Sequence, residues 1–199
     1  EVGQVAETLL SLGTGLGLST AAGFNAYLSL LITGILARTT DLITLDVPFN
    51  RLEEPVVLGA IAAIGVIDFV GDKVPPVDHV LHAVGLVVAP VAGAVLALSA
   101  TSDTDVLPAV ALIMGVLAAE ATQGARASVR PLSTVSTGGI GNPVLSLGED
   151  GLSATLSFAA IIVPLVALVL VAAIVVLVVW ALRRARRRRP SSAAPLVRP

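Results

Sequence analysis

Long apolar segments separated by short polar ones set the strongest limit on how this chain can fold. Five of them approach the length that crosses a bilayer, which is about 20 helical residues for a hydrocarbon core of about 30 Å. None shows the alternation of apolar and polar residues that is typical of barrel strands. We therefore predict an all-α, polytopic transmembrane helix bundle of about five spans. The segments lie within residues 19–38, 55–70, 77–100, 106–125 and 152–182.

The overall composition agrees with a membrane domain. Hydrophobic residues make up 55% of the chain and charged residues 13%, whereas soluble domains contain about 45–50% and about 25%. We predict one transmembrane domain, residues 1–182, followed by a basic, disordered tail, residues 183–199. The chain contains no cysteine, which excludes disulfides and thiolate metal sites. It begins Glu-Val without a basic segment, so we expect no signal peptide.

The end of the last apolar segment predicts the orientation of the chain. Trp180 is followed by six arginines within residues 183–189. An interfacial aromatic residue followed by a basic cluster is typical of a stop-transfer signal on the cytoplasmic side. Binding of nucleic acid or anionic lipid is the alternative interpretation of the cluster, and we favour the topological one. We therefore predict a multi-pass protein of the inner membrane with a cytoplasmic C-terminus and no nucleic-acid partner.

Five spans with this orientation create a conflict. They place Lys73, Arg126 and Arg130 on the outer side, against the tendency of basic residues to stay inside. Either one extra hairpin exists, or these charges are buried within the protein. We favour burial, because each charge lies beside an acid or at the boundary of a segment.

Two stretches, residues 11–25 and 131–148, are apolar but rich in Gly, Ser and Thr. Irregular backbone at membrane depth is tolerated only where protein or a water-filled cavity surrounds it, so both are candidates for broken or re-entrant segments. For the first stretch, close helix packing around Gly13–Gly17 is the favoured alternative. For the second, the Asn142-Pro143 pair favours an irregular functional loop.

The two stretches also resemble each other. Residues 19–30 read STAAGFNAYLSL and residues 136–147 read STGGIGNPVLSL, each with one of the three asparagines of the chain. We predict that these windows meet near the middle of the protein, on a seam between two weakly related halves. Coincidence in a biased composition is the alternative.

Ionisable residues at membrane depth are expensive and are candidates for function. Glu120 lies six residues before Arg126, and we expect either a proton or ion relay or a salt bridge between them. Asp78, His79 and His82 are weak metal candidates, but no second ligand cluster exists, so we expect interfacial histidines and no metal. Glu149 and Asp150 precede the last segment, where acids favour a helix N-terminus.

No sequence motif of a known enzyme class is present. HExxH, GxSxG and Walker sequences are all missing. Both histidines lie in one segment, so the serines have no His-Asp partner at a common site. We expect neither catalysis nor a cofactor.

Three stretches carry a family resemblance: GFNAYLSLLITGILAR, DKVPPVD and RPLSTVSTGGIGNPVLSLGED. Together they resemble the bacterial integral-membrane family catalogued as domain of unknown function 4126, over nearly all of residues 10–182. The resemblance implies a membrane fold but no activity. The positions that match the family pattern are Asn25, Tyr27, Asp72, Lys73, Pro75, Asp78, Arg130, Asn142, Glu149 and Asp150.

Our leading hypothesis is a small transporter or channel for an unknown solute or ion, with the bilayer and a second copy of the chain as candidate partners. The alternative is a scaffold or assembly subunit whose polar residues hold helices together. The candidate residues of a polar cavity are Asn25, Tyr27, Asp68, Asp72, Lys73, Glu120, Arg126, Arg130 and Asn142.

Overall fold

The computed structural model describes residues 2–71, 75–138 and 141–187, and within these ranges the chain is all helical, as predicted. Seven α-helices and one short 3-10 helix account for the described elements. In chain order they are α1 (Val2–Phe24), α2 (Ala26–Thr39), η1 (Phe49–Glu53), α3 (Pro55–Gly71), α4 (Pro75–Ala100), α5 (Pro108–Thr137), α6 (Asn142–Ile162) and α7 (Pro164–Arg187).

Proline determines where most of these helices begin. It occupies the first position of α3, α4, α5 and α7 and the second position of α6. Proline lacks the N–H that a first helical turn leaves unpaired, and its fixed φ suits that position. It also disfavours helical geometry in the preceding residue. Val163, with φ −140° and ψ 77°, therefore ends α6 before Pro164.

This break corrects one predicted span. The segment within residues 152–182 is not a single helix but the second half of α6 followed by α7. Helix α7 also continues to Arg187, so residues 183–187 are helical and do not belong to a disordered tail.

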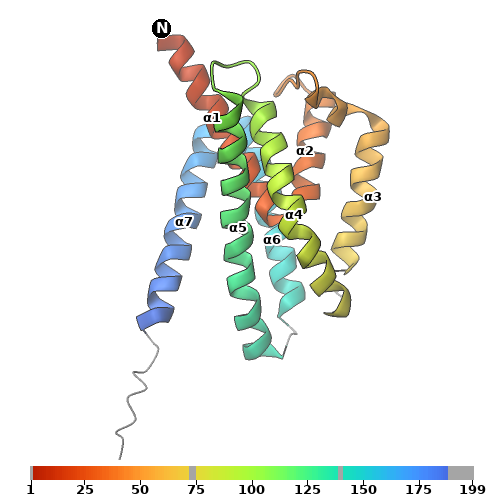
Figure 1. Ribbon diagram of the computed structural model, residues 1–199, viewed down its shortest axis with the longest axis vertical. Coiled ribbons are helices and arrows are strands. Elements are labelled where there is room, and N and C mark those ends of the chain that lie inside the picture. The colour runs from red at the N-terminus through yellow and green to blue at the C-terminus, as the bar shows by residue number, and fades with distance from the viewer. Residues whose placement is uncertain (1, 72–74, 139–140, 188–199) are drawn as a thin grey trace, which may run out of the picture.

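Helices α3 to α7 run alternately along the long axis of the molecule (Figure 1). Helices α3, α5 and α7 lead from the upper to the lower end of the view, and α4 and α6 lead back. The loops before α3 and between α4 and α5 lie at the upper end, whereas α5 and α7 end at the lower end.

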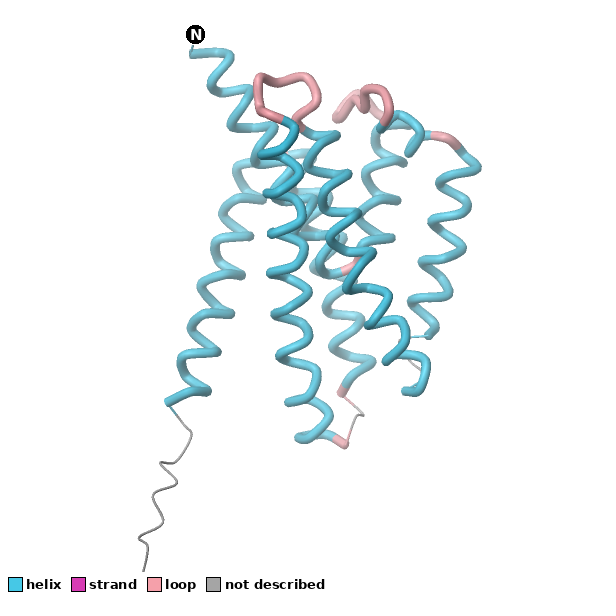
Figure 2. The backbone as a smooth tube through the Cα atoms, in the orientation of Figure 1, coloured by secondary structure: helices cyan, strands magenta, loops and turns pink. Residues whose placement is uncertain are grey.

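Helices α1 and α2 form a hairpin. Helix α1 enters from the upper end, the chain breaks at Asn25 about half-way along the bundle, and α2 returns to the upper end (Figure 2). A bond from Ser29 Oγ to the Leu18 carbonyl, 3.2 Å, ties the two arms together above the break. Residues 19–38 are therefore not one continuous helix, and the prediction of a broken segment is confirmed at Asn25.

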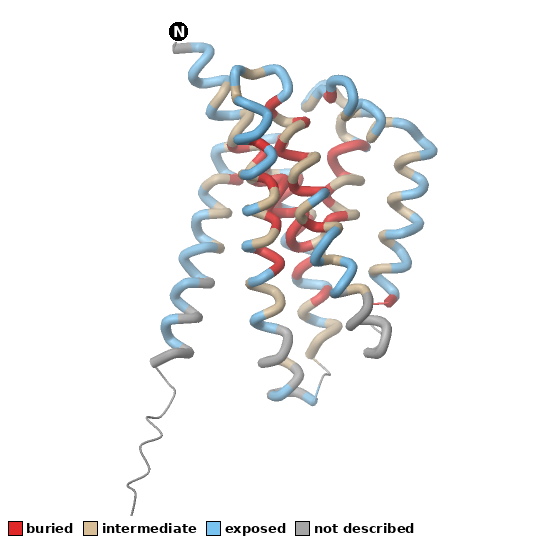
Figure 3. The backbone as a smooth tube through the Cα atoms, viewed as in Figure 1, coloured by how far each residue is buried: buried red, intermediate tan, exposed pale blue. Residues whose placement is uncertain are grey.

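Helix α1 lies at the centre of the bundle, where it packs against α4, α5, α6 and α7. Buried backbone gathers around it in the upper half of the molecule (Figure 3). Added methyl groups at Gly15 and Gly17 would lie 3.3 Å from Ala97 Cα and 2.8 Å from Ala160 Cβ. The glycines of residues 13–17 thus serve close packing, as we favoured.

The second Gly-rich stretch is more regular than expected. Helix α5 continues to Thr137 and ends at Gly138, whose φ of 62° is the left-handed geometry of a helix cap. Helix α6 begins at Asn142, at the lower end of the bundle. Asn25 binds Asp150, eight residues beyond Asn142 on α6. Part of the second window lies outside the described residues, so the meeting of the two windows stays a prediction.

Two described helical stretches combine the length and hydropathy of a membrane span, Ala83–Ala100 and Pro108–Val129. Three further apolar stretches are shorter: Ala26–Thr39, Pro55–Gly71 and Pro164–Leu177.

Candidate functional site

The tip of the hairpin formed by α1 and α2 is built around Asn25. Its backbone is extended, with φ −149° and ψ 105°, and its Oδ1 accepts a 3.0 Å bond from the Leu28 N–H. The side chain thereby caps α2, a role for which asparagine is among the preferred residues. Its Nδ2 donates to Asp150 Oδ1 over 2.8 Å. The Asn25 side chain therefore caps the start of α2 and also connects the break between α1 and α2 to α6.

Arg126 of α5 also contacts the hairpin tip, at the end of α1. Its Nη2 lies 2.7 Å from Glu149 Oε2 in an ion pair whose side chains are 14% and 10% exposed. Its Nη1 donates to Gln123 Oε1, 3.0 Å, and to the Gly23 carbonyl, 3.3 Å. Charge-assisted bonds of this kind are about twice as strong as neutral ones. The guanidinium thus joins α5, α6 and the end of α1.

Serines of α6 satisfy the backbone around the break. The Ser153 hydroxyl can donate to either of two carbonyl oxygens, that of Ala21 at 3.0 Å or that of Asn25 at 3.1 Å. One turn further on, Ser157 Oγ donates to Ser29 Oγ over 3.1 Å. Both α6 serines are fully buried. Buried backbone groups need such partners, so α6 makes the interruption sustainable.

The two charges nearest the tip match the dipoles of the two half-helices. Helix α1 ends at the tip with partial negative charge on its last carbonyls, and Arg126 binds one of them at Gly23. Helix α2 begins there with partial positive charge, and Asp150 is held beside it by Asn25. Each half-helix terminus is therefore complemented by a charge of the opposite sign. We call Asn25, Gln123, Arg126, Glu149, Asp150 and Ser153 the polar centre.

A small, partly open cavity adjoins the polar centre. Its volume is about 30 Å³, which is enough for a water molecule, because one water needs about 10–15 Å³ by this measure. Polar groups from three helices contribute to its wall. They belong to Asn25, Tyr27, Asp68, Gln123 and Arg126.

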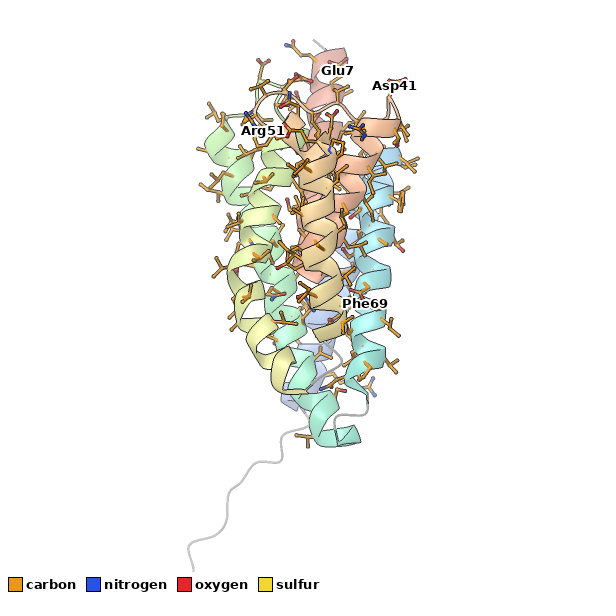
Figure 4. All side chains as sticks on the ribbon, turned by 90° about the vertical axis from the view of Figure 1, so that its right-hand side faces the viewer. Glu7, Asp41, Arg51 and Phe69 are labelled. Atoms are coloured by element: carbon orange, nitrogen blue, oxygen red, sulfur yellow. The ribbon has the colours of Figure 1, made fainter. Side chains whose placement is uncertain are left out.

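A larger, more open groove lies on the other side of Asn25 and Tyr27, between α2, α3 and α6. Its volume is about 320 Å³. We call it the lateral groove. It is lined by Asn25, Tyr27, Leu28, Leu31, Ala62, Gly65, Val66, Phe69 and Asp150. Figure 4 looks onto α3 and shows Phe69 near its lower end, on the side that faces α6.

The structure brings together four of the predicted cavity residues, Asn25, Tyr27, Asp68 and Arg126. Glu120 lies half-buried on α5 and lines neither the small cavity nor the lateral groove. Asn142 lies at the start of α6, away from the tip. The remaining calls fall outside what the structure describes: Asp72 and Lys73 are outside the described residues, and the side chains of Arg130, Asp78, His79 and His82 are not described.

Two expectations about the charges are corrected. The partner of Arg126 is Glu149 and not Glu120, because α6 brings Glu149 against the face of α5 that carries Arg126. Glu149 and Asp150 do not precede a helix but lie two turns inside α6, which begins at Asn142. Among the described side chains, no group of three or more potential metal ligands is present.

Sequence reasoning missed the polar stripe of α6. Ser146, Glu149, Ser153 and Ser157 are all buried. Their spacings of three, four and four residues place them on one helical face. The helical spacing of these residues is present in the sequence, but it can be assigned to one helical face only when α6 is known to begin at Asn142.

The comparisons with known proteins give one finding. A family model described as "Domain of unknown function (DUF4126)" matches residues 12–184, which confirms the resemblance. No curated protein and no solved structure matches the chain.

Proposed function

The chain belongs to the DUF4126 family, and we propose that it is a small integral membrane carrier that moves a polar solute or ion through the polar centre. The supporting argument has three steps: the surface of the bundle, its topology, and the position of the hairpin tip.

The distribution of polar and apolar residues supports a membrane location. Large apolar side chains are exposed along the outside of α3 to α7, among them Val66 at 61%, Leu117 at 62% and Val176 at 66%. The described interior buries hydroxyl, amide and carboxylate groups beside small and branched apolar side chains. A contiguous exposed apolar surface is costly in water and favourable in lipid. This pattern favours a bundle surrounded by hydrocarbon.

A re-entrant first hairpin removes the conflict over charge. With five crossings, by α3 to α7, the end of α3 and the lower half of α5 lie at the same end as the basic end of α7. Arg130 then lies on the inner side, as the positive-inside tendency requires. Charged residues at the opposite end include Glu7, Asp41 and Arg51 (Figure 4). We propose that this opposite end faces the outside of the cell.

The position of the hairpin tip is the observation that carries the functional proposal. Interrupted helices whose ends meet half-way across a membrane are the usual ion and substrate sites of secondary transporters. Here such a tip carries a carboxylate, a guanidinium and a cavity large enough for water. An alternating opening of α3 or α6 around the fixed tip would expose the site first to one side and then to the other.

A scaffold remains the second candidate, and the pairing of Arg126 with Glu149 favours it. A paired, hydrogen-bonded charge needs no solute to be stable. The two functions differ in whether charge moves across the membrane.

Reconstitution on a solid-supported membrane tests the proposal. We expect a transient current after a jump in H⁺, Na⁺, K⁺ or methylammonium with the intact chain. Asp150→Asn should abolish the current, whereas Ser128→Ala, at an exposed position of α5, should leave it unchanged. Absence of current for all four cations would contradict a carrier of small cations and favour the scaffold.

A further inference from the structure

Gln123 of α5 is a buried amide that uses one of its two ends within the protein. The residue is 1% exposed, and its Oε1 accepts the 3.0 Å bond from Arg126 Nη1. Among the described residues, no acceptor is bonded to its Nε2. The large majority of buried side-chain polar atoms have a hydrogen-bond partner, either in the protein or in an ordered water. The Gln123 Nε2 therefore calls for an acceptor that the described chain does not supply.

The free end of this amide lies at the small cavity. Gln123 and Gly85 of α4 both line the cavity. A methyl group added to Gly85 would lie 2.8 Å from Gln123 Nε2, so the nitrogen faces the glycine. A side chain at position 85 would take the space next to the nitrogen. Glycine at this position therefore keeps room beside the amide for a small ligand.

Acceptors for the other side of such a ligand come from the end of α1. The last four carbonyls of an α-helix have no partner within the helix. In α1 the Gly23 carbonyl is bound by Arg126. Ala22 and Phe24 line the small cavity, and among the described residues no donor is bonded to their carbonyls. The cavity thus adjoins one free donor group and two free acceptors.

This mixture of a donor and acceptors selects the ligand. A cation is disfavoured by the N–H group of Gln123 and by Arg126, which lines the same cavity. An anion is disfavoured by the negative end of the α1 dipole. Asp68 also lines the cavity, but it already has an interaction partner, so no free carboxylate is assigned to the site. A molecule that both accepts and donates suits these groups, and water is the smallest that does.

We propose that the small cavity binds one or two water molecules, which accept a hydrogen bond from Gln123 Nε2 and donate to the carbonyls of Ala22 and Phe24. The cavity volume of about 30 Å³ is enough for two, because each water needs about 10–15 Å³. A buried water typically makes about three hydrogen bonds, and these three groups supply them. The inference goes beyond the proposed function, because a carrier and a scaffold both need the end of α1 to be satisfied.

Water-edited solid-state NMR of the protein in lipid bilayers tests this assignment. The chain contains two glutamines, Gln4 and Gln123, so selective ¹⁵N labelling of the glutamine side chains gives two amide signals. Gln4 is exposed and reports contact with bulk solvent. We expect polarisation from water protons to reach the Gln123 amide at short mixing times, as it does at Gln4, although Gln123 is buried.

Two glycine variants separate a bound water from slow transfer through the protein. Gly85→Ala places a methyl group beside Gln123 Nε2 and should remove the transfer to Gln123 without changing the transfer to Gln4. Gly124→Ala, at the next position of α5 with open space around it, is the matched control and should leave both signals unchanged. Thermal unfolding of each variant confirms that it is folded.

The unchanged chain decides the first outcome, so the test stands even if Gly85→Ala does not fold. Absence of transfer to Gln123 in the unchanged chain would overturn the assignment, and so would full transfer in folded Gly85→Ala. A Gln123 signal that moves when NaCl or NH₄Cl is added, while that of Gln4 stays in place, would show that an ion occupies the cavity instead of water. None of these results depends on whether the protein carries a current.

Discussion

Asn25 Nδ2 lies 2.8 Å from Asp150 Oδ1, so the side chain at the interruption between α1 and α2 is bonded directly to α6. The same amide caps α2 through its oxygen. Asn25 therefore contributes both to the geometry of the hairpin tip and to the position of the neighbouring carboxylate.

Asn25→Ala removes both bonds at once. Loss of a helix cap costs about 1 kcal/mol, and loss of a bond to a charged group costs about 1.5–3 kcal/mol. We expect the free energy of unfolding in detergent to fall by about 2–4 kcal/mol. Asn50→Ala, at an exposed position of η1, is the control and should change it by less than about 0.5 kcal/mol. Equal effects at the two positions would contradict the role of the cap.

The Arg126–Glu149 pair should behave as a buried ion pair. Glu149→Gln leaves a guanidinium without its countercharge, which typically costs about 3–5 kcal/mol. The double change Arg126→Met, Glu149→Leu should recover much of this loss, since an apolar pair replaces the charges. A double-mutant cycle measured by denaturant unfolding gives the coupling.

The exposed pair Arg51–Glu54 provides the matched control for that cycle. Its shortest distance is 3.8 Å and its side chains are 76% and 53% exposed. Its coupling should lie below about 1 kcal/mol. Coupling energies of similar size for the two pairs would mean that Arg126 and Glu149 are solvated.

Gly93 and Gly115 mark the closest contact between α4 and α5. A methyl group on Gly93 would lie 2.6 Å from the Gly115 carbonyl oxygen, and one on Gly115 would lie closer still to that of Gly93. Gly115→Ala should therefore separate the helices and lower the free energy of unfolding by about 1–3 kcal/mol. Gly124→Ala, on the same helix with open space around it, should instead raise it by up to about 1 kcal/mol.

Most of the helices could be predicted from sequence, whereas the hairpin could not. Hydropathy identifies apolar segments, but it does not distinguish a helix that crosses from one that turns back at Asn25. The signal for the turn is one capping residue among small ones, and whether it acts depends on α6 supplying Ser153 and Asp150. Pro164, by contrast, is a local indication of the break between α6 and α7. The apolar residues on both sides of it give the whole segment the hydropathy of one continuous helix, so the break was not predicted.

The site was predictable to the extent that its residues are rare in such a chain. Asn25, Asp68 and Arg126 are polar residues within apolar segments, and Tyr27 matches the family pattern; all four line one cavity. Glu120 is also a charged residue within an apolar segment, but it does not line this cavity. The rotation of α5 about its own axis decides which of its charged residues faces the polar centre. The pairing of Arg126 with Glu149 spans 23 residues and two helices, so spacing alone could not give it.

The loops at the upper end should respond to pH. A hydrogen bond with Asp46 and the charge of Asp46 raise the pKa of Asp103 above its ordinary value. A raised carboxyl pKa means that the folded state favours the protonated form. The contact therefore stabilises the fold at low pH and is lost as pH rises through the raised pKa. Asp103→Asn should raise the Tm slightly at pH 7 relative to the unchanged chain, and this difference should disappear below about pH 3.5.

The re-entrant hairpin makes a prediction about sidedness that separates it from a conventional span. If residues 19–38 crossed the membrane, Glu7 and Asp41 would lie on opposite sides. In the structure both lie at the upper end (Figure 4). Because the chain contains no cysteine, single cysteines at these positions can be labelled without background by a maleimide that does not cross membranes.

We expect Glu7→Cys and Asp41→Cys to be labelled from the outside of intact cells, and Arg183→Cys to be labelled only after the cells are opened. This result follows if α3 to α7 cross the membrane five times as we propose, because an odd number of crossings separates the two ends of the bundle. The basic end of α7 predicts which end is inside. Labelling of Glu7→Cys and Asp41→Cys from opposite sides would show that α1 and α2 form a span. The tip at Asn25 would then be a helix kink, and the central argument for a carrier would fail.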